Sequence, residues 1–158
     1  MFEPDKDGVI ARIDASPIRR MFAVVMLIVL GALLVYVAFT SQAGFVSRIV
    51  LLAFGVVALI YADMLRRATQ AAILLTSDGL VTTDGVQLAP IDDIASVQRG
   101  AFAFKPSHGF TLVMKSKQPR GWAPGMWWRF GTRVGIGGVT PAGPAKFVAE
   151  NIALRIAK

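Results

Sequence analysis

Residues 21–39 read MFAVVMLIVLGALLVYVAF, a run of 19 residues without a charge, and a second apolar run, residues 45–65, follows after a short turn. A helix of the first length covers about 28 Å, close to the thickness of the hydrocarbon core of a bilayer. The second run contains Arg48 and Asp63, but both lie near its ends, where charged side chains can reach the polar interface. The sequence therefore predicts a transmembrane hairpin over residues 21–67, with helices at about 21–39 and 45–65.

The charges that flank the hairpin predict its orientation. Two arginines precede the first run and two follow the second, whereas the turn at residues 40–44 has no charge. The flanking cations are Arg19, Arg20, Arg66 and Arg67. Because positively charged flanks stay in the cytoplasm, we expect both termini there and the turn outside. The rest of the chain then forms a cytoplasmic N-terminal segment, residues 1–20, and a cytoplasmic domain, residues 68–158.

Two other interpretations of the apolar runs compete with the membrane hairpin. In one, the first run is a cleaved signal peptide with Ser41 and Ala43 at the cleavage site. That run is longer than the apolar region of a typical signal peptide, and four acidic residues precede it. In the other, the second run is a buried core helix. It is apolar on all faces, however, whereas a helix at the surface of a soluble protein has a polar stripe. Both observations favour membrane helices.

The composition fits one membrane hairpin and one small domain. The chain has 158 residues, 54% of them hydrophobic, and it has no cysteine. The lack of cysteine excludes disulfides, thiol catalysis and thiolate metal sites. The net charge of +7 belongs to residues 66–158, which carry twelve basic and five acidic groups. No acidic residue occurs between Ile94 and Ala149, so we expect this domain to be attracted to anionic headgroups.

Short apolar segments separated by Gly, Asp and Pro follow the hairpin, which is the pattern of antiparallel strands joined by turns. We expect strands at residues 72–76, 80–83, 86–89, 94–99, 101–104, 110–115, 127–132 and 134–139. A long loop, residues 116–126, interrupts the series. A helix then begins with Thr140 as its N-cap and Pro141 at its first position. Its core-facing stripe consists of Val148, Ile152 and Ile156. These elements predict a strongly bent sheet or partly open barrel that the helix covers.

Two segments resemble the bacterial pleckstrin-homology-like (bPH) domain, namely LLTSDGL at residues 74–80 and LAPIDDIASV at residues 88–97. In that family a strand leads into a Pro-Ile-x-x-Ile-x-x-Val segment, and two membrane helices often precede the domain. The resemblance implies an α+β protein of the bacterial inner membrane, with a PH-like domain of two packed antiparallel sheets capped by a C-terminal helix. It implies no reaction, and the tryptophan-rich residues 121–130 lie outside the family pattern.

The residues that an enzyme would need are scarce. His108 is the only histidine, and no second metal-ligand type lies near it in sequence. Asp92 and Asp93 are adjacent, so on an extended segment they point to opposite sides, which favours turn capping over a carboxylate pair. The glycines of residues 135–138 lack both the Gly-Lys-Ser/Thr ending of a phosphate loop and the Rossmann spacing, and tight packing explains them better. We therefore expect no catalytic residue, no cofactor and no metal.

The segment from Arg120 to Arg133 is the best candidate for a working surface, because it contains all three tryptophans and three arginines. Alternation along a strand predicts that Trp128 and Phe130 are buried and that their neighbours are exposed. The residues that we expect to contact a protein partner or lipid are Lys115, Lys117, Arg120, Trp122, Trp127 and Arg129. An alternative is that half of these rings belong to the core. Nucleic acid is disfavoured as a partner, since a membrane tether already accounts for the charge.

The sequence thus predicts a non-enzymatic accessory or assembly subunit that docks a cytoplasmic PH-like domain onto a larger membrane protein complex. Small residues in both helices offer surfaces for close packing, namely Gly31, Ala32, Ala38, Gly55 and Ala58. The alternative function is a membrane-tethered sensor of anionic lipid, in which Arg120, Trp122 and the two nearby lysines engage headgroups. The sequence leaves open whether Asp63 pairs with Arg66 or Arg67 one turn later or with a neighbouring subunit.

Overall fold

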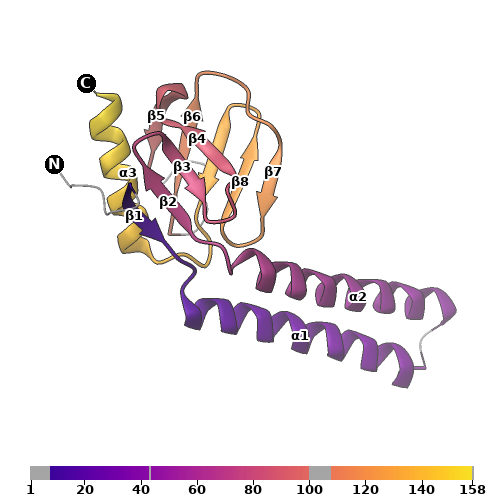
Figure 1. Cartoon of the computed structure of the whole chain (residues 1–158). Coiled ribbons are helices and arrows are strands. Elements are labelled where there is room, and N and C mark those ends of the chain that lie inside the picture. The colour runs from indigo at the N-terminus through magenta and orange to yellow at the C-terminus, as the bar shows by residue number, and fades with distance from the viewer. Residues whose placement is uncertain (1–7, 43, 100–107, 158) are drawn as a thin grey trace. The chain divides into compact units, whose positions relative to one another are not determined.

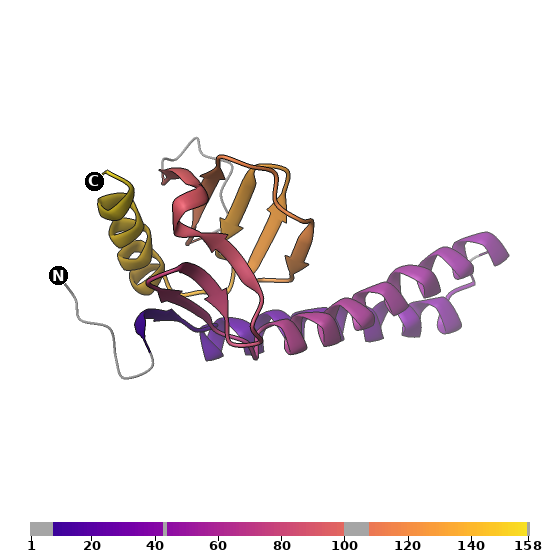
Figure 2. The same cartoon turned by 45° about the horizontal axis from the view of Figure 1, so that its top comes forward.

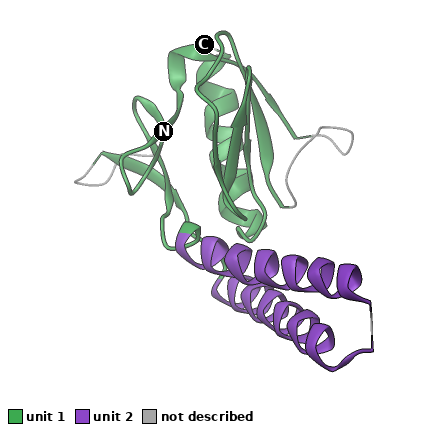
Figure 3. Ribbon diagram, turned by 90° about the vertical axis from the view of Figure 1, so that its right-hand side faces the viewer, with its two compact units in different colours: residues 1–16, 68–158 green, residues 17–67 purple. Residues whose placement is uncertain are grey.

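The computed structural model describes residues 8–42, 44–99 and 108–157. The chain forms two compact units, a helical one over residues 17–67 and a β-rich one that combines the residues up to Ser16 with those from Ala68 onward (Figure 3). The expected strand at residues 101–104 lies outside the described residues.

The helical unit consists of α1, Pro17–Thr40, and α2, Phe45–Ala68, each 24 residues long. Both helices are long and apolar enough to span a membrane, and they extend a few residues beyond the predicted bounds. Within the most apolar window of each helix, 11% of α1 and 17% of α2 is buried. A core helix of a soluble protein would be covered over most of its length, so the buried-helix interpretation does not fit. Examples of the exposed side chains are Phe22, Leu33, Tyr36, Phe54 and Ile60.

The two helices pack closely at paired glycines. A Cβ atom on Gly31 would lie 2.7 Å from the Leu59 Cγ and 3.0 Å from the carbonyl oxygen of Gly55. A Cβ atom on Gly55 would lie 2.8 Å from the Val35 Cγ2. These distances are too short for a side chain, so each glycine is needed for the approach of the other helix. The prediction of close packing is confirmed at Gly31, Ala38, Gly55 and Ala58, whereas Ala32 is exposed.

Asp63, near the end of α2, pairs with both arginines one turn later. Its carboxylate lies 2.9 Å from Arg66 Nη2 and 2.7 Å from Arg67 Nε. These are the (i, i+3) and (i, i+4) spacings at which helical side chains meet. The one acidic group of α2 is therefore neutralised within its own helix.

The β-rich unit contains two antiparallel sheets and a C-terminal helix (Figure 1). The first sheet has the order β1-β2-β3-β4, with bounds Val9–Ile13, Ile73–Thr76, Gly79–Thr82 and Gln87–Pro90. A short 3₁₀ helix, η1, Ile91–Asp93, leads into the second sheet. The second sheet has the order β5-β6-β9-β8-β7, with bounds Ile94–Gln98, Phe110–Met114, Arg133–Ile136, Trp127–Phe130 and Gly121–Ala123. The predicted α+β class, with antiparallel sheets and a C-terminal helix, is confirmed.

Strand β1 comes from the segment before the hairpin and completes the first sheet. It pairs antiparallel with β2, with Ala11 opposite Leu75 and Ile13 opposite Ile73. The Ile13 side chain is fully buried in the core, and the Ser16 N–H donates a 2.8 Å hydrogen bond to the carbonyl oxygen of Val139. The predicted boundaries separated residues 1–20 from residues 68–158, whereas both flanks of the hairpin belong to one unit.

The core lies between the two sheets and α3, Ala142–Ile156, which contacts β1 of the first sheet and β5 of the second (Figure 2). The fully buried side chains include Ile13, Ile73, Leu75, Leu80, Leu88, Phe110, Leu112, Val134, Ile136, Val148 and Ile152. The predicted helix stripe is confirmed at Val148 and Ile152, while Ile156 is half-buried at its margin. The helix begins one residue later than predicted, because the extended Pro141, with ψ 142°, is the cap and the buried Thr140 precedes it.

The largest differences between the predicted and the observed strand ends have local reasons. Strands β8 and β9 end at Phe130 and Ile136, because Gly131 and Gly137 follow with φ values of 59° and 144°, which turn the chain. The expected loop at residues 116–126 contains the short strand β7, whose three residues are too few to show a period of two.

We predict that Ile13→Ala lowers the free energy of unfolding of the β-rich unit by about 3 kcal/mol, because it removes a fully buried side chain from a packed core. Urea unfolding of the full-length protein in detergent micelles measures the change. Arg12→Ala, on the exposed side of the same strand, is the control and is expected to change stability by about 0.5 kcal/mol or less. Equal stability of the two variants would show that β1 is not part of the core.

Candidate functional site

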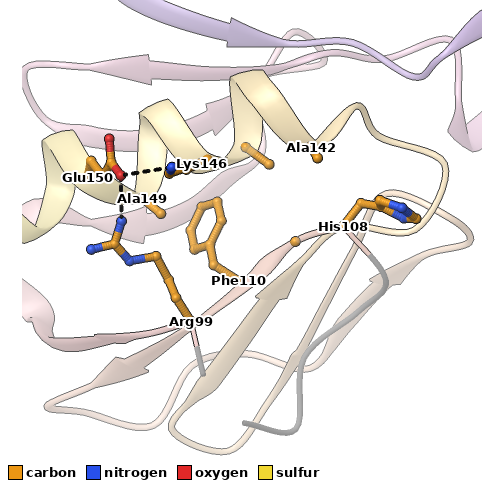
Figure 4. Close-up of a pocket in the computed structure, with 9 residues that line it drawn as sticks. Arg99, His108, Phe110, Ala142, Lys146, Ala149 and Glu150 are labelled. Carbon is orange, nitrogen blue, oxygen red and sulfur yellow. Dashed lines mark ion pairs between the residues drawn. The ribbon is translucent and has the colours of Figure 1, made fainter. Parts of the chain in front are cut away.

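A cleft between α3 and the start of β6 is lined by several titratable side chains of the β-rich unit (Figure 4). It has a volume of about 510 Å³, and Arg99, His108 and Glu150 contribute to its lining. Glu150 is engaged by two cations, with Arg99 Nη1 at 3.3 Å and Lys146 Nζ at 4.0 Å. The His108 ring is exposed and points away from Glu150, so the two groups form no acid-base pair. Among the described residues, no group of three or more His, Asp or Glu side chains is placed to hold a metal.

The two adjacent aspartates hold a loop. Both lie in η1, where the Asp93 carboxylate accepts a 3.1 Å hydrogen bond from the Ser116 N–H and a 2.7 Å bond from its hydroxyl. The side-chain amide of Gln118 also donates to Asp93, and Lys115 Nζ donates to the Asp92 carbonyl oxygen at 2.8 Å. The Asp93 carboxylate therefore fixes the chain that follows β6, a distant contact, rather than capping its own turn as predicted.

The glycine-rich residues before α3 serve packing, as predicted. A Cβ atom on Gly135 would lie 2.2 Å from Cε2 of Trp128, so the indole ring lies directly on this glycine. A Cβ atom on Gly138, whose φ is 125°, would lie 2.7 Å from the carbonyl oxygen of Gly125. Neither glycine has room for a side chain, because Gly135 contacts the Trp128 ring and Gly138 contacts the Gly125 backbone.

The outer face of the second sheet carries a row of aromatic side chains. Trp122 on β7 is opposite Trp128 on β8, and Trp128 is opposite Gly135 on β9. Residues that are opposite each other in a sheet lie on the same face, and Phe130 lies on that face because it is two positions from Trp128. Trp122 is 53% exposed and Phe130 is 60% exposed.

Two arginines border this row. The Arg120 guanidinium lies 4.6 Å from the centre of the Phe130 ring, a cation–π distance. Arg133 is opposite Phe130 in the register of β8 and β9 and is also exposed. We define the aromatic face by its five residues, Arg120, Trp122, Trp128, Phe130 and Arg133. Since no acidic residue occurs between Ile94 and Ala149, every charge that these strands and loops contribute is positive.

The predicted contact residues Trp127 and Arg129 lie on the opposite, inner face. Trp127 is opposite Ile136 and packs against the core. The Arg129 Nε and Nη1 donate to the carbonyl oxygens of Pro119 at 2.5 Å and Gln87 at 2.6 Å, so this side chain ties β4 to the second sheet. The predicted alternation was therefore wrong for Phe130, which is exposed rather than buried.

The remaining predicted residues divide between two places. Arg120 and Trp122 belong to the aromatic face, whereas Lys115 and Lys117 lie on the exposed chain after β6. The sequence reasoning did not select Phe130 or Arg133. A usable signal was Gly135, because a glycine within a strand often marks the position that a large ring from the neighbouring strand covers.

No family model, no curated protein and no solved structure matches the chain. The resemblance to the bPH domain stays a prediction, and the function has to be argued from the surface itself.

The two faces of β8 predict different effects for two tryptophan substitutions. Trp127→Ala is expected to lower the free energy of unfolding by about 2 kcal/mol, because the ring packs on the core. Trp122→Ala is expected to change it by about 0.5 kcal/mol or less, because the ring is more than half exposed. Urea unfolding of the full-length variants in detergent compares them. A larger loss for Trp122→Ala would contradict the assignment of the faces.

Proposed function

We propose that this chain is a non-enzymatic accessory or assembly subunit of a larger membrane protein complex. In this proposal α1 and α2 span the bacterial inner membrane, both termini lie in the cytoplasm, and the β-rich unit is a PH-like domain that docks onto a partner protein. The two packed sheets with a C-terminal helix are the arrangement that the resemblance to the bPH domain implies.

The connections between the helices and the β-rich unit support the anchoring role. Three residues join β1 to α1, and four residues join α2 to β2. Because an extended residue spans at most about 3.5 Å, linkers of this length allow the domain little freedom to leave the membrane in which the proposal places the helices. A domain tethered in this way works at the surface of the membrane.

The aromatic face is the observation that carries the proposal. Trp122 and Phe130 expose large apolar rings, and Arg120 and Arg133 lie beside them. Aromatic residues and arginine are the types enriched at the centres of protein interfaces, where a few of them supply most of the binding energy. Every residue of the aromatic face except Arg120 lies in a strand of the second sheet. The surface is therefore ordered before a partner arrives.

A sensor of anionic lipid is the second candidate function, and the charge of the domain favours it. Lys115 and Lys117 add two exposed cations on the chain before β7, and a tryptophan beside cations suits the headgroup level of a bilayer. In this alternative the domain needs no protein partner.

Affinity isolation of the tagged full-length protein from membranes in mild detergent, followed by mass spectrometry, tests the proposal. We predict that a stoichiometric partner is recovered with the wild type and lost with Trp122→Ala combined with Arg120→Ala. Leu154→Ala is the matched control, because this exposed apolar side chain lies on α3, outside the aromatic face, and it is expected to keep the partner.

Recovery of the chain alone with the wild type would contradict the accessory role. Binding of the same protein to vesicles of phosphatidylglycerol that weakens with added salt would then support the lipid sensor.

A further inference from the structure

We propose that the aromatic face binds an acidic protein segment, whose apolar side chains lie on Trp122 and Phe130 and whose carboxylates pair with Arg120 and Arg133. This inference rests on the proposed function and names the chemistry of the partner.

The arginines of the β-rich unit separate into two groups by their partners. Four of the described ones are engaged within the chain. Arg12 pairs with Asp14, Arg99 with Glu150, Arg129 donates to two carbonyl oxygens, and Arg155 donates to one at 3.2 Å.

Among the described residues of this unit, the two arginines whose side chains make neither an ion pair nor a hydrogen bond are Arg120 and Arg133. Both border the exposed rings of the aromatic face. The two described arginines of this unit that remain available for a carboxylate therefore both border the aromatic face.

The side chain of Arg120 is prepared for this role by Phe130. The Arg120 Cζ lies over the Phe130 ring, 4.6 Å from its centre, while the guanidinium N–H groups stay available to donate. A guanidinium presents these donors as a planar fork that matches the two oxygens of a carboxylate. Stacking restricts the side chain before binding, so less conformational entropy is lost when a carboxylate arrives.

The contact between Arg120 and Phe130 also disfavours a bilayer as the ligand of the aromatic face. For Phe130 to enter the apolar part of a membrane, the charge stacked on it would have to follow or the contact would have to break. A protein segment offers an apolar side chain and a carboxylate side by side, which satisfies the ring and the cation together. An anionic bilayer, in contrast, is attracted to basic charge that is spread over a surface.

The test uses the full-length protein in nanodiscs of phosphatidylcholine and a fluorescent peptide that alternates glutamate and leucine. A second peptide with glutamine in place of every glutamate isolates the contribution of the carboxylates. We expect the glutamate peptide to bind at least about tenfold more tightly than the glutamine peptide, because only the first can form charge-assisted hydrogen bonds.

The protein variants locate the binding site. Arg120→Gln combined with Arg133→Gln is expected to weaken binding of the glutamate peptide at least about tenfold. Lys146→Gln combined with Arg155→Gln removes the same charge from the exposed side of α3 and is expected to change binding by about twofold or less. Thermal unfolding verifies that both double variants are folded.

Three results would overturn the inference. These are equal binding of the two peptides, equal loss in the two double variants, and binding of phosphatidylglycerol vesicles through Arg120 and Arg133 without binding of the glutamate peptide. If affinity isolation recovers a partner that Arg120→Gln with Arg133→Gln still retains, the accessory role stands and this inference fails. If no partner is recovered at all, the accessory role itself fails.

Discussion

The pairing of β1 with β2 is the constraint on which the rest of the structure depends. These strands are separated in sequence by the whole helical hairpin, yet they are neighbours in one sheet. The pairing buries Ile13 in the core and brings the residues before the first helix into the same unit as the C-terminal part of the chain. Both flanks of the hairpin therefore belong to one folded unit, and that unit is attached to the helices by two short linkers.

The second sheet uses its two faces for different tasks. On β8 the inner side chains are Trp127, which packs on the core, and Arg129, which ties β4 to this sheet. The outer side chains are Trp128, which covers Gly135, and Phe130, which is exposed beneath Arg120. The contacts of Trp127 and Arg129 hold β8 in place, and β8 carries Trp128 and Phe130 on its outer side. An aromatic surface held by a sheet, in a chain that also carries two long apolar helices, is the physical basis of the proposed docking role.

Local and periodic signals predicted much of this structure. The apolar runs predicted both helices, the glycine and alanine positions predicted their close packing, and turn residues located most of the strands. Strand β1 was not predicted, because its five residues are short and their partner lies some sixty positions away, where no local pattern points to it. Which side chains of β8 face the core was also not predictable, since its four successive aromatic or basic residues give no contrast between the two faces. That orientation decides which members of the tryptophan-rich segment reach the surface.

Disulfide formation between two introduced cysteines tests the pairing of β1 with β2 most directly. Arg12 and Leu74 are opposite each other in the register, and the chain has no cysteine of its own. In oxidised membrane vesicles, the full-length protein with Arg12→Cys and Leu74→Cys is predicted to form a bond within one chain, while the two single variants keep a free thiol. Two thiols that stay free for maleimide labelling, or a bond only between two chains, would contradict the account.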